Sequence, residues 1–168
     1  MHYRIPPHTI ALTSQVQDIY RATDFDGDGT MDGIIPTIAR TEILDLNSPG
    51  YRFGATTIAV NDFLDLWSQE DHSEFCLALL LTYRDFAQGV LGLAWVAEPA
   101  GGNRGGICED RVRLQVGERS LNTAIVTFLN YGARQPRSVS VITVAHEFGH
   151  NFGSPVSCGP LSLPPISA

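Results

Sequence analysis

Several residue and segment types are missing from this chain of 168 residues, and each absence narrows its possible functions. All 11 basic residues are arginine, none is lysine, and with 18 acidic residues the formal net charge is −7. A broad nucleic-acid-binding face needs an excess of basic residues, so we expect no nucleic-acid partner. The longest apolar stretch, residues 75–81, is too short to span a bilayer, and residues 1–8 lack the pattern of a secretory signal. We therefore expect neither a membrane segment nor a signal peptide in this chain.

Cysteine is also scarce. The three cysteines, Cys76, Cys108 and Cys158, form an odd set, so at least one of them stays free or pairs outside the chain. What is present suits a globular protein, because 43% of the residues are hydrophobic, 17% are charged, and the length suits one domain with a sizeable core. Residues 1–85 hold 13 acidic residues and 5 arginines, whereas residues 86–168 hold 5 and 6. An acidic front half therefore precedes a nearly neutral back half.

Hydrophobic periodicity predicts an alternation of helices and strands. Apolar residues at helical spacing predict helices over residues 10–20 and from residue 57 onward, and a last helix that begins at Ser138 or Ser140 as its N-cap. β-Branched or continuous apolar runs predict four strands. These are residues 34–44, 75–82, 91–96 and 123–129. The order predicts an α/β fold with a mixed sheet of about four strands and a last helix near the C-terminus.

The strongest functional signal is the sequence His-Glu-Phe-Gly-His at residues 146–150, in the last predicted helix. Positions i and i+4 share one helix face at a Cβ separation of roughly 5–6 Å. His146 and His150 could therefore hold one tetrahedral metal ion, for which zinc is expected. Glu147 would then act as a general base on metal-bound water and not as a ligand. The alternative is that two histidines share a helix face by chance, with no metal.

Further runs of sequence surround this motif, at residues 90–96, 105–109, 120–123, 130–132 and 145–155. Together they resemble the metzincin metalloproteases, and more narrowly the ADAM (reprolysin, peptidase M12B) family in its Kuzbanian or alpha-secretase branch. The resemblance implies a metzincin-like sheet and a zinc endopeptidase domain over residues 1–155, incomplete at both ends. It implies protein substrates, namely ectodomains of membrane proteins such as Notch-type receptors, that are cut in the secretory pathway or at the extracellular face. It also implies a peptide substrate that lies along an edge strand at Gly92, Leu93 and Ala94.

The chain departs from this family where a third zinc ligand is expected. The family pattern runs from the second histidine to a glycine, here Gly153, and has a third histidine three residues later, where this chain has Val156. Valine has no lone pair to donate, and residues 151–168 contain no His, Asp or Glu, so only Cys158 could offer a donor. The alternative to an active protease is therefore an inactive relative that binds substrates or partners without cleaving them.

The same resemblance bears on the two ends of the chain. It implies that Cys76 and Cys108 pair with cysteines outside these residues. The proline-rich, uncharged residues 156–168 show no amphipathic period, which predicts an unrelated flexible tail.

A second, acidic motif lies in the front half. Asp24, Asp26, Asp28 and Asp32 have the spacing of the first nine positions of an EF-hand-like calcium loop. The twelfth position, where a bidentate glutamate is expected, is Ile35. Calcium binding is one hypothesis, and a short Asp/Gly-rich turn that needs no metal is the other.

Two other features have unremarkable interpretations. His72 lies beside Asp71 and near Glu74, which predicts a solvated surface cluster. Trp67 and Trp95 lie in apolar periodic segments and are predicted to pack in the core.

Overall fold

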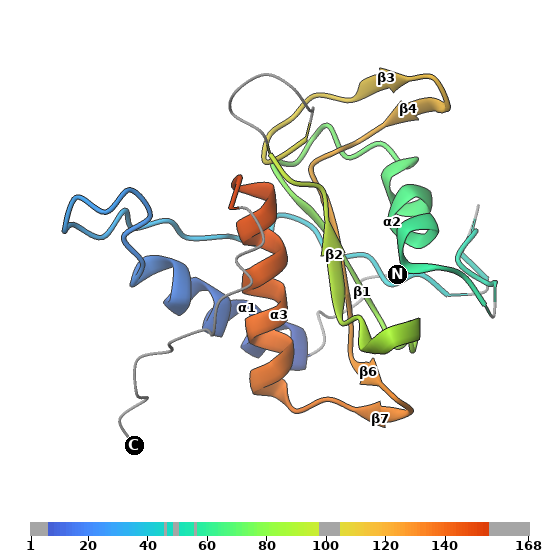
Figure 1. Cartoon of the computed structure of the whole chain (residues 1–168), viewed down its shortest axis with the longest axis horizontal. Coiled ribbons are helices and arrows are strands. Elements are labelled where there is room, and N and C mark those ends of the chain that lie inside the picture. Colours follow the sequence, from blue (N-terminus) through green and yellow to red (C-terminus); the bar gives the residue numbers. More distant parts are fainter. Residues whose placement is uncertain (1–6, 46, 49–50, 56, 98–104, 155–168) are drawn as a thin grey trace.

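The structure is a computed structural model that describes residues 7–45, 47–48, 51–55, 57–97 and 105–154. Three α-helices lie on the two sides of a small sheet (Figure 1). The helices are α1 (Pro7–Arg21), α2 (Val60–Ser68) and α3 (Arg137–Asn151), with a short 3₁₀ helix at Ala87–Gly89. The strands are β1 (Ala78–Thr82), β2 (Gly92–Ala94), β3 (Val112–Leu114), β4 (Gly117–Arg119), β5 (Thr123–Thr127), β6 (Leu129–Asn130) and β7 (Ala133–Arg134). None of the helices in these ranges is long and apolar enough to cross a membrane.

The main sheet has the strand order β1-β5-β2, with β5 in the centre. β5 runs parallel to β1 and antiparallel to β2, and Ile125 pairs with Leu80 on one side and with Leu93 on the other. All five residues of β5 are buried, as expected for a central strand covered on both faces. Two further antiparallel pairs, β3 with β4 and β6 with β7, lie outside this sheet.

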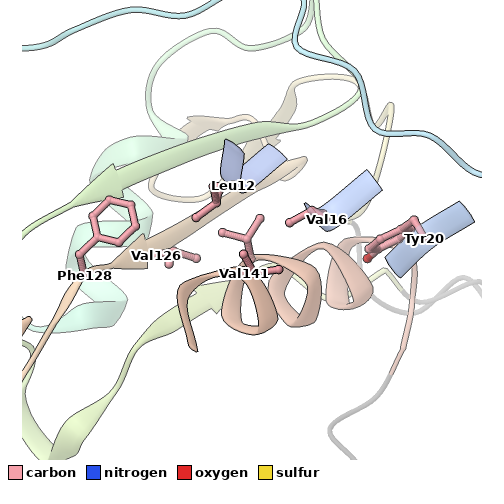
Figure 2. Packing of buried hydrophobic residues seen from close by; sticks show 7 residues of the cluster. Leu12, Val16, Tyr20, Val126, Phe128 and Val141 are labelled. Atoms are coloured by element: carbon pink, nitrogen blue, oxygen red, sulfur yellow. The ribbon is translucent and has the colours of Figure 1, made fainter. Parts of the chain in front are cut away.

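α1 and α3 cover one face of the sheet. Leu12, Val16 and Tyr20 recur every four residues along α1 and are almost fully buried. They pack against side chains of β5 and α3, as Figure 2 shows. The Tyr20 hydroxyl also donates a hydrogen bond to the carbonyl of Ala145, at 2.9 Å. This contact fixes α1 to the part of α3 that carries the histidine motif.

α2 covers the opposite face. Successive side chains of a strand point to opposite faces, and Val126 of β5 accordingly packs under α1 and α3 while Ile125 packs against Phe63 and Leu64 of α2. Trp67 and Trp95 are half-buried against this second cluster, which agrees with their predicted core positions.

The predicted α/β class and all three predicted helices are confirmed, but one predicted strand is wrong. Residues 34–44 form no strand in the structure, so the main sheet has three described strands and not about four. The predicted N-cap of the last helix is wrong too. α3 begins at Arg137 after Pro136, so Ser138 and Ser140 lie inside its first turns. Proline fixes its own φ near −65° and starts the helix without a side-chain cap.

Two predictions about side chains also change. His72 is buried, with 6% of its surface exposed, because its ring packs on Trp67 and its Nε2 atom lies 3.2 Å from the Trp67 carbonyl oxygen. It is therefore not part of a solvated cluster. Cys76 and Cys108 form a disulfide with each other, contrary to the expected partners outside the chain. Val156, Cys158 and the predicted tail at 156–168 lie outside the described residues.

Candidate active site

The histidine motif occupies the last turns of α3. His146 and His150 lie one turn apart, and their Nε2 atoms are 3.1 Å from each other. In a tetrahedral zinc site with Zn–N bonds of about 2.0–2.1 Å, two ligand nitrogens are about 3.4 Å apart. The two rings therefore already converge on one point, as two ligands of a single ion must.

A hydrogen bond at the other ring nitrogen sets the tautomer of His150. The Nδ1 atom of His150 lies 2.9 Å from the carbonyl oxygen of Ser154. A carbonyl oxygen only accepts hydrogen bonds, so Nδ1 carries the proton and Nε2 keeps a free lone pair. Burial and the neighbouring His150 both lower the pKa of His146. His146 thus favours the neutral form that a metal ion needs, and His150 turns its Nε2 atom toward the same point.

Glu147 lies between the histidines in sequence but points to the sheet. Only 4% of its surface is exposed, and its Oε2 atom has no hydrogen-bond partner among the described residues. Burial raises the pKa of Glu147 to about 8. A Cβ atom placed on Gly92 would lie 2.4 Å from Oε1 of Glu147, so any side chain at position 92 would force this carboxyl group to move.

The structure therefore brings the predicted substrate strand and the predicted general base together. β2 comprises Gly92, Leu93 and Ala94, and it pairs with β5 on one side only. Its other side has no strand partner within the described ranges, which leaves a backbone edge that could pair with an extended peptide. The carboxyl group of Glu147 lies next to this edge at Gly92.

Asn151 is a functional-site residue that the sequence analysis missed. It is fully buried, and its side-chain amide donates to the carbonyl of Trp95 at 2.8 Å and to that of Thr123 at 3.4 Å. These bonds fix the end of α3 to the ends of β2 and β5. A polar residue directly after the motif was the available signal, but only the fold shows that its partners are backbone carbonyls.

The described residues supply two candidate zinc ligands, His146 and His150, and no third beside them. The only group of three or more His, Cys, Asp or Glu donor atoms within 4.8 Å of one another in the described part of the chain is Asp24, Asp26 and Asp28. His146 and His150 thus fit zinc as a two-nitrogen site beside a buried carboxyl group, and the position at which the family has its third histidine is Val156.

The acidic motif forms a separate turn. The carboxylate of Asp24 accepts hydrogen bonds from the backbone N–H groups of Gly27 and Gly29, at 2.7 and 2.8 Å, and the bond from Gly29 is the main cause of its lowered pKa. Asp32 accepts from the N–H of Phe25 and does not join the other three carboxylates. The turn is therefore organised by its own carboxylate-to-backbone bonds, as an Asp/Gly-rich turn without metal would be.

Comparison with known proteins identifies the family of this chain. Residues 6–159 match the family model of metallopeptidase family M12B, reprolysin-like. The chain is 46% identical over 157 residues to the disintegrin and metalloproteinase domain-containing protein 10 homolog of Caenorhabditis elegans, an alignment that covers 83% of this chain and 16% of that protein. It is 45% identical over 145 residues to disintegrin and metalloproteinase domain-containing protein 10 of Homo sapiens, and the same holds for the Mus musculus protein, with 86% of this chain and 19% of each relative covered. The chain spans less than a fifth of the length of these relatives, and it belongs to the M12B reprolysin-like family of metallopeptidases.

Proposed function

We propose that this chain carries the hydrolytic centre of a zinc-dependent endopeptidase. The observation that supports it is the convergence of two imidazole Nε2 atoms, 3.1 Å apart, beside the unpartnered buried carboxyl group of Glu147. His146 and His150 would hold zinc, which when bound polarises a carbonyl group and lowers the pKa of water to about 7.

Residues of this chain would bind the peptide, transfer the proton and orient the histidine ring. The free edge of β2 binds an extended peptide through backbone hydrogen bonds, which brings a scissile bond next to Gly92 and the neighbouring Glu147. Glu147 would take a proton from a water molecule as the water oxygen bonds to the scissile carbonyl carbon, and would pass this proton to the amine nitrogen as the C–N bond breaks. Its burial beside β2 excludes bulk water from this transfer. The Nδ1–H group of His150, bound to Ser154, keeps its ring oriented.

The second candidate is a relative that binds peptides along β2 without cleaving them. Val156 favours it, because catalytic zinc sites in proteins ordinarily have three protein ligands and the described residues offer two, His146 and His150. The two candidates share the peptide-binding edge and differ only in whether zinc is retained.

A measurement of zinc and cleavage separates the candidates. The purified chain, the variant Val156→His and the matched control Val156→Ala are dialysed against zinc, analysed for bound metal, and assayed with a quenched peptide. We expect less than one equivalent of zinc and no chelator-sensitive cleavage for the chain and for Val156→Ala. Val156→His should bind a full equivalent and cleave.

The results can contradict either candidate. A full equivalent of zinc and cleavage by the unaltered chain, lost in Glu147→Ala, would contradict the non-cleaving candidate. If Val156→His folds and still binds no zinc, the proposed roles of His146 and His150 are wrong.

We propose membrane-protein ectodomains, including Notch-type receptors, as the substrate class, encountered in the secretory pathway or at the extracellular face. The similarity to disintegrin and metalloproteinase domain-containing protein 10 supports this proposal. Peptides from the juxtamembrane segments of such proteins should bind β2 more tightly than scrambled peptides. Equal binding of both sets would contradict it.

A further inference from the structure

Two asparagine side chains are completely buried near the start of β5. Asn122 directly precedes this strand and Asn151 is the last residue of α3, and both are 0% exposed. Each side-chain amide donates two hydrogen bonds to backbone carbonyls, and neither side-chain oxygen has a partner among the described residues. Burial of an amide costs free energy unless hydrogen bonds offset it. The donated bonds therefore show which segments each asparagine holds together.

The amide of Asn151 lies where β2 and β5 stop pairing. The ladder ends at Ala94, which pairs with Ala124. At the next position, the backbone N–H of Trp95 donates to the carbonyl of Thr123, at 3.3 Å. Asn151 donates to both carbonyls there, at 2.8 Å to Trp95 and at 3.4 Å to Thr123. A side chain of α3 therefore supplies donors at the end of the β2–β5 ladder.

Backbone bonds accompany this side-chain contact. The N–H of Ala97 donates to the carbonyl of His150, and the N–H of Ile107 donates to the carbonyl of Asn151, both at 3.0 Å. Carbonyls in the last turn of a helix have no partner within the helix, so these bonds satisfy them. They involve only the main chain. A substitution of the Asn151 side chain therefore leaves them in place and removes only the bonds to Trp95 and Thr123.

The free edge of β2 presents the backbone groups of Gly92 and Ala94. The carbonyl of Leu91 accepts a backbone hydrogen bond from β5 at 2.8 Å, and the N–H of Trp95 donates to the carbonyl of β5's first residue. In an antiparallel pair, successive residues of a strand alternate between the two edges. Residues 91, 93 and 95 therefore bond toward β5, and the N–H and C=O groups of Gly92 and Ala94 lie at the free edge. A peptide that pairs with β2 would bond to these two residues.

Two residues of α3 contact β2, one near each end of the strand. Glu147 lies against Gly92, and Asn151 donates to Trp95, the residue that follows the strand. The two helix residues are four positions apart and so share one helix face. The bond from Asn151 to Trp95 therefore sets where the free edge of β2 lies relative to the carboxyl group of Glu147.

We propose that Asn151 is a positioning residue for peptide binding at β2, an inference that rests on the peptide-binding edge of the proposed function. The amide would hold Trp95, and with it Ala94, in a fixed place beside α3. A peptide backbone could then bond to Gly92 and Ala94 at the same time. If the end of β2 fluctuated, one of these contacts would be lost for part of the time. Asn151 would act through Trp95 and would not touch the peptide.

Peptide affinity in two matched variants tests this proposal. Asn151→Ala and Asn122→Ala each remove one fully buried amide that donates to two backbone carbonyls. The bonds of Asn122 go to His72 and Phe75, just before β1, and β1 lies on the other side of β5 from β2. The probe is the fluorescein-labelled, amidated peptide Gly-Thr-Val-Ala-Val-Thr-Gly, and fluorescence anisotropy measures its dissociation constant. We expect Asn151→Ala to raise this constant about tenfold, and Asn122→Ala to raise it by less than about twofold.

Amide hydrogen exchange by NMR, in the absence of peptide, locates the change in each variant. In Asn151→Ala, the amide of Trp95 should exchange about tenfold faster. In Asn122→Ala, exchange should accelerate just before β1, and not at Trp95. Slow exchange at Ile125, in the centre of the sheet, shows that a variant is folded. If Asn151→Ala does not fold, Asn151→Ser replaces it, and because the serine hydroxyl keeps one donor, we expect an intermediate loss of affinity.

Several results would overturn the proposal. Equal losses of affinity in the two variants would make Asn151 a structural residue only. Unchanged affinity in Asn151→Ala would show that the end of β2 takes no part in binding. If the unaltered chain does not bind the probe, or binds a probe N-methylated at its central three residues equally well, the peptide-binding edge itself is wrong, and the role of Asn151 with it. The first two results appear only between variants and the last in the unaltered chain, so the two failures are distinguishable.

Discussion

The two edges of the main sheet differ in what lies against them. At the β2 edge, α3 places a buried carboxyl group against Gly92, and Asn151 bonds the helix to the strand ends. At the β1 edge, no described strand lies on the side of β1 away from β5, and a cavity of about 680 Å³ runs along it. Both edges expose backbone donors and acceptors, but only the β2 edge has the buried carboxyl group of Glu147 beside it. The difference shows that the helix packed next to an edge strand decides which side chains lie beside its free backbone groups.

The largest expected effect comes from the strand that both edges share. Ile125 is fully buried in β5 and pairs with β1 and β2, so Ile125→Ala leaves a cavity in the centre of the sheet. We expect the free energy of unfolding to fall by about 4 kcal/mol. Urea denaturation measures it, with Ile35→Ala as the control, because Ile35 is 48% exposed and the same truncation should cost less than about 0.5 kcal/mol there. Equal costs would mean that β5 is not the common core of both edges.

The second-largest expected effect is a pH dependence of the free energy of unfolding, which arises from Glu147 beside the β2 edge. Burial raises the pKa of Glu147 from its ordinary value of 4.5 to about 8, so the folded protein binds a proton that the unfolded chain has lost. Without metal, stability is therefore full well below pH 4.5 and falls by about 4 kcal/mol as the pH rises from 4.5 to 8. Glu147→Gln should remove most of that slope. Thermal or urea unfolding in EDTA across this range measures it, and an equally steep slope in both proteins would place the carboxyl group in water.

A double-mutant cycle measures the contact between Gly92 of β2 and Glu147 of α3. Gly92→Ala adds a Cβ atom 2.4 Å from Oε1 of Glu147, and we expect a cost of about 2 kcal/mol. In the Glu147→Ala background, the added methyl group has room, so most of that cost should disappear. The coupling energy from urea unfolding of the four proteins reports the contact directly. Additive effects would show that Gly92 does not make room for Glu147.

The smallest expected effect concerns α1, the helix that carries Tyr20 and packs over one face of the sheet. Tyr20→Phe removes the hydrogen bond to the Ala145 carbonyl but keeps the buried ring, so we expect a loss of about 1 kcal/mol. Amide exchange should accelerate along α1, whose residues Leu12 and Val16 line the cavity. Exchange at Ala94 on the opposite edge should change little. Uniform acceleration at both positions would mean that the two edges open together.

The local sequence predicted most of the helices because their signals are local. Leu12, Val16 and Tyr20 mark one helical face, and His146 and His150 share another, whatever surrounds them. The buried strands β1 and β5 were also predicted, because continuous apolar runs favour strands covered on both faces. The family was predictable from the sequence as well, because residues 6–159 match the M12B reprolysin-like family model.

The predictions that failed depended on partners distant in the sequence. Residues 34–44 have the composition of a strand, but a strand exists only when another backbone pairs with it, and none of the described segments does. His72 lies among acidic residues in the sequence, but its ring is buried on Trp67 in the fold. Neither outcome can be derived from neighbouring residues.

For this protein, the sequence by itself determined the two candidate metal-binding histidines, their spacing on one helix, and the absence of a histidine at position 156. Only the tertiary structure decided that Glu147 is buried against Gly92, that Asn151 bonds α3 to the sheet, and that one sheet edge is left open along a cavity. Spacing along a helix is set by its 3.6-residue period, whereas burial and strand pairing depend on which distant segments pack together.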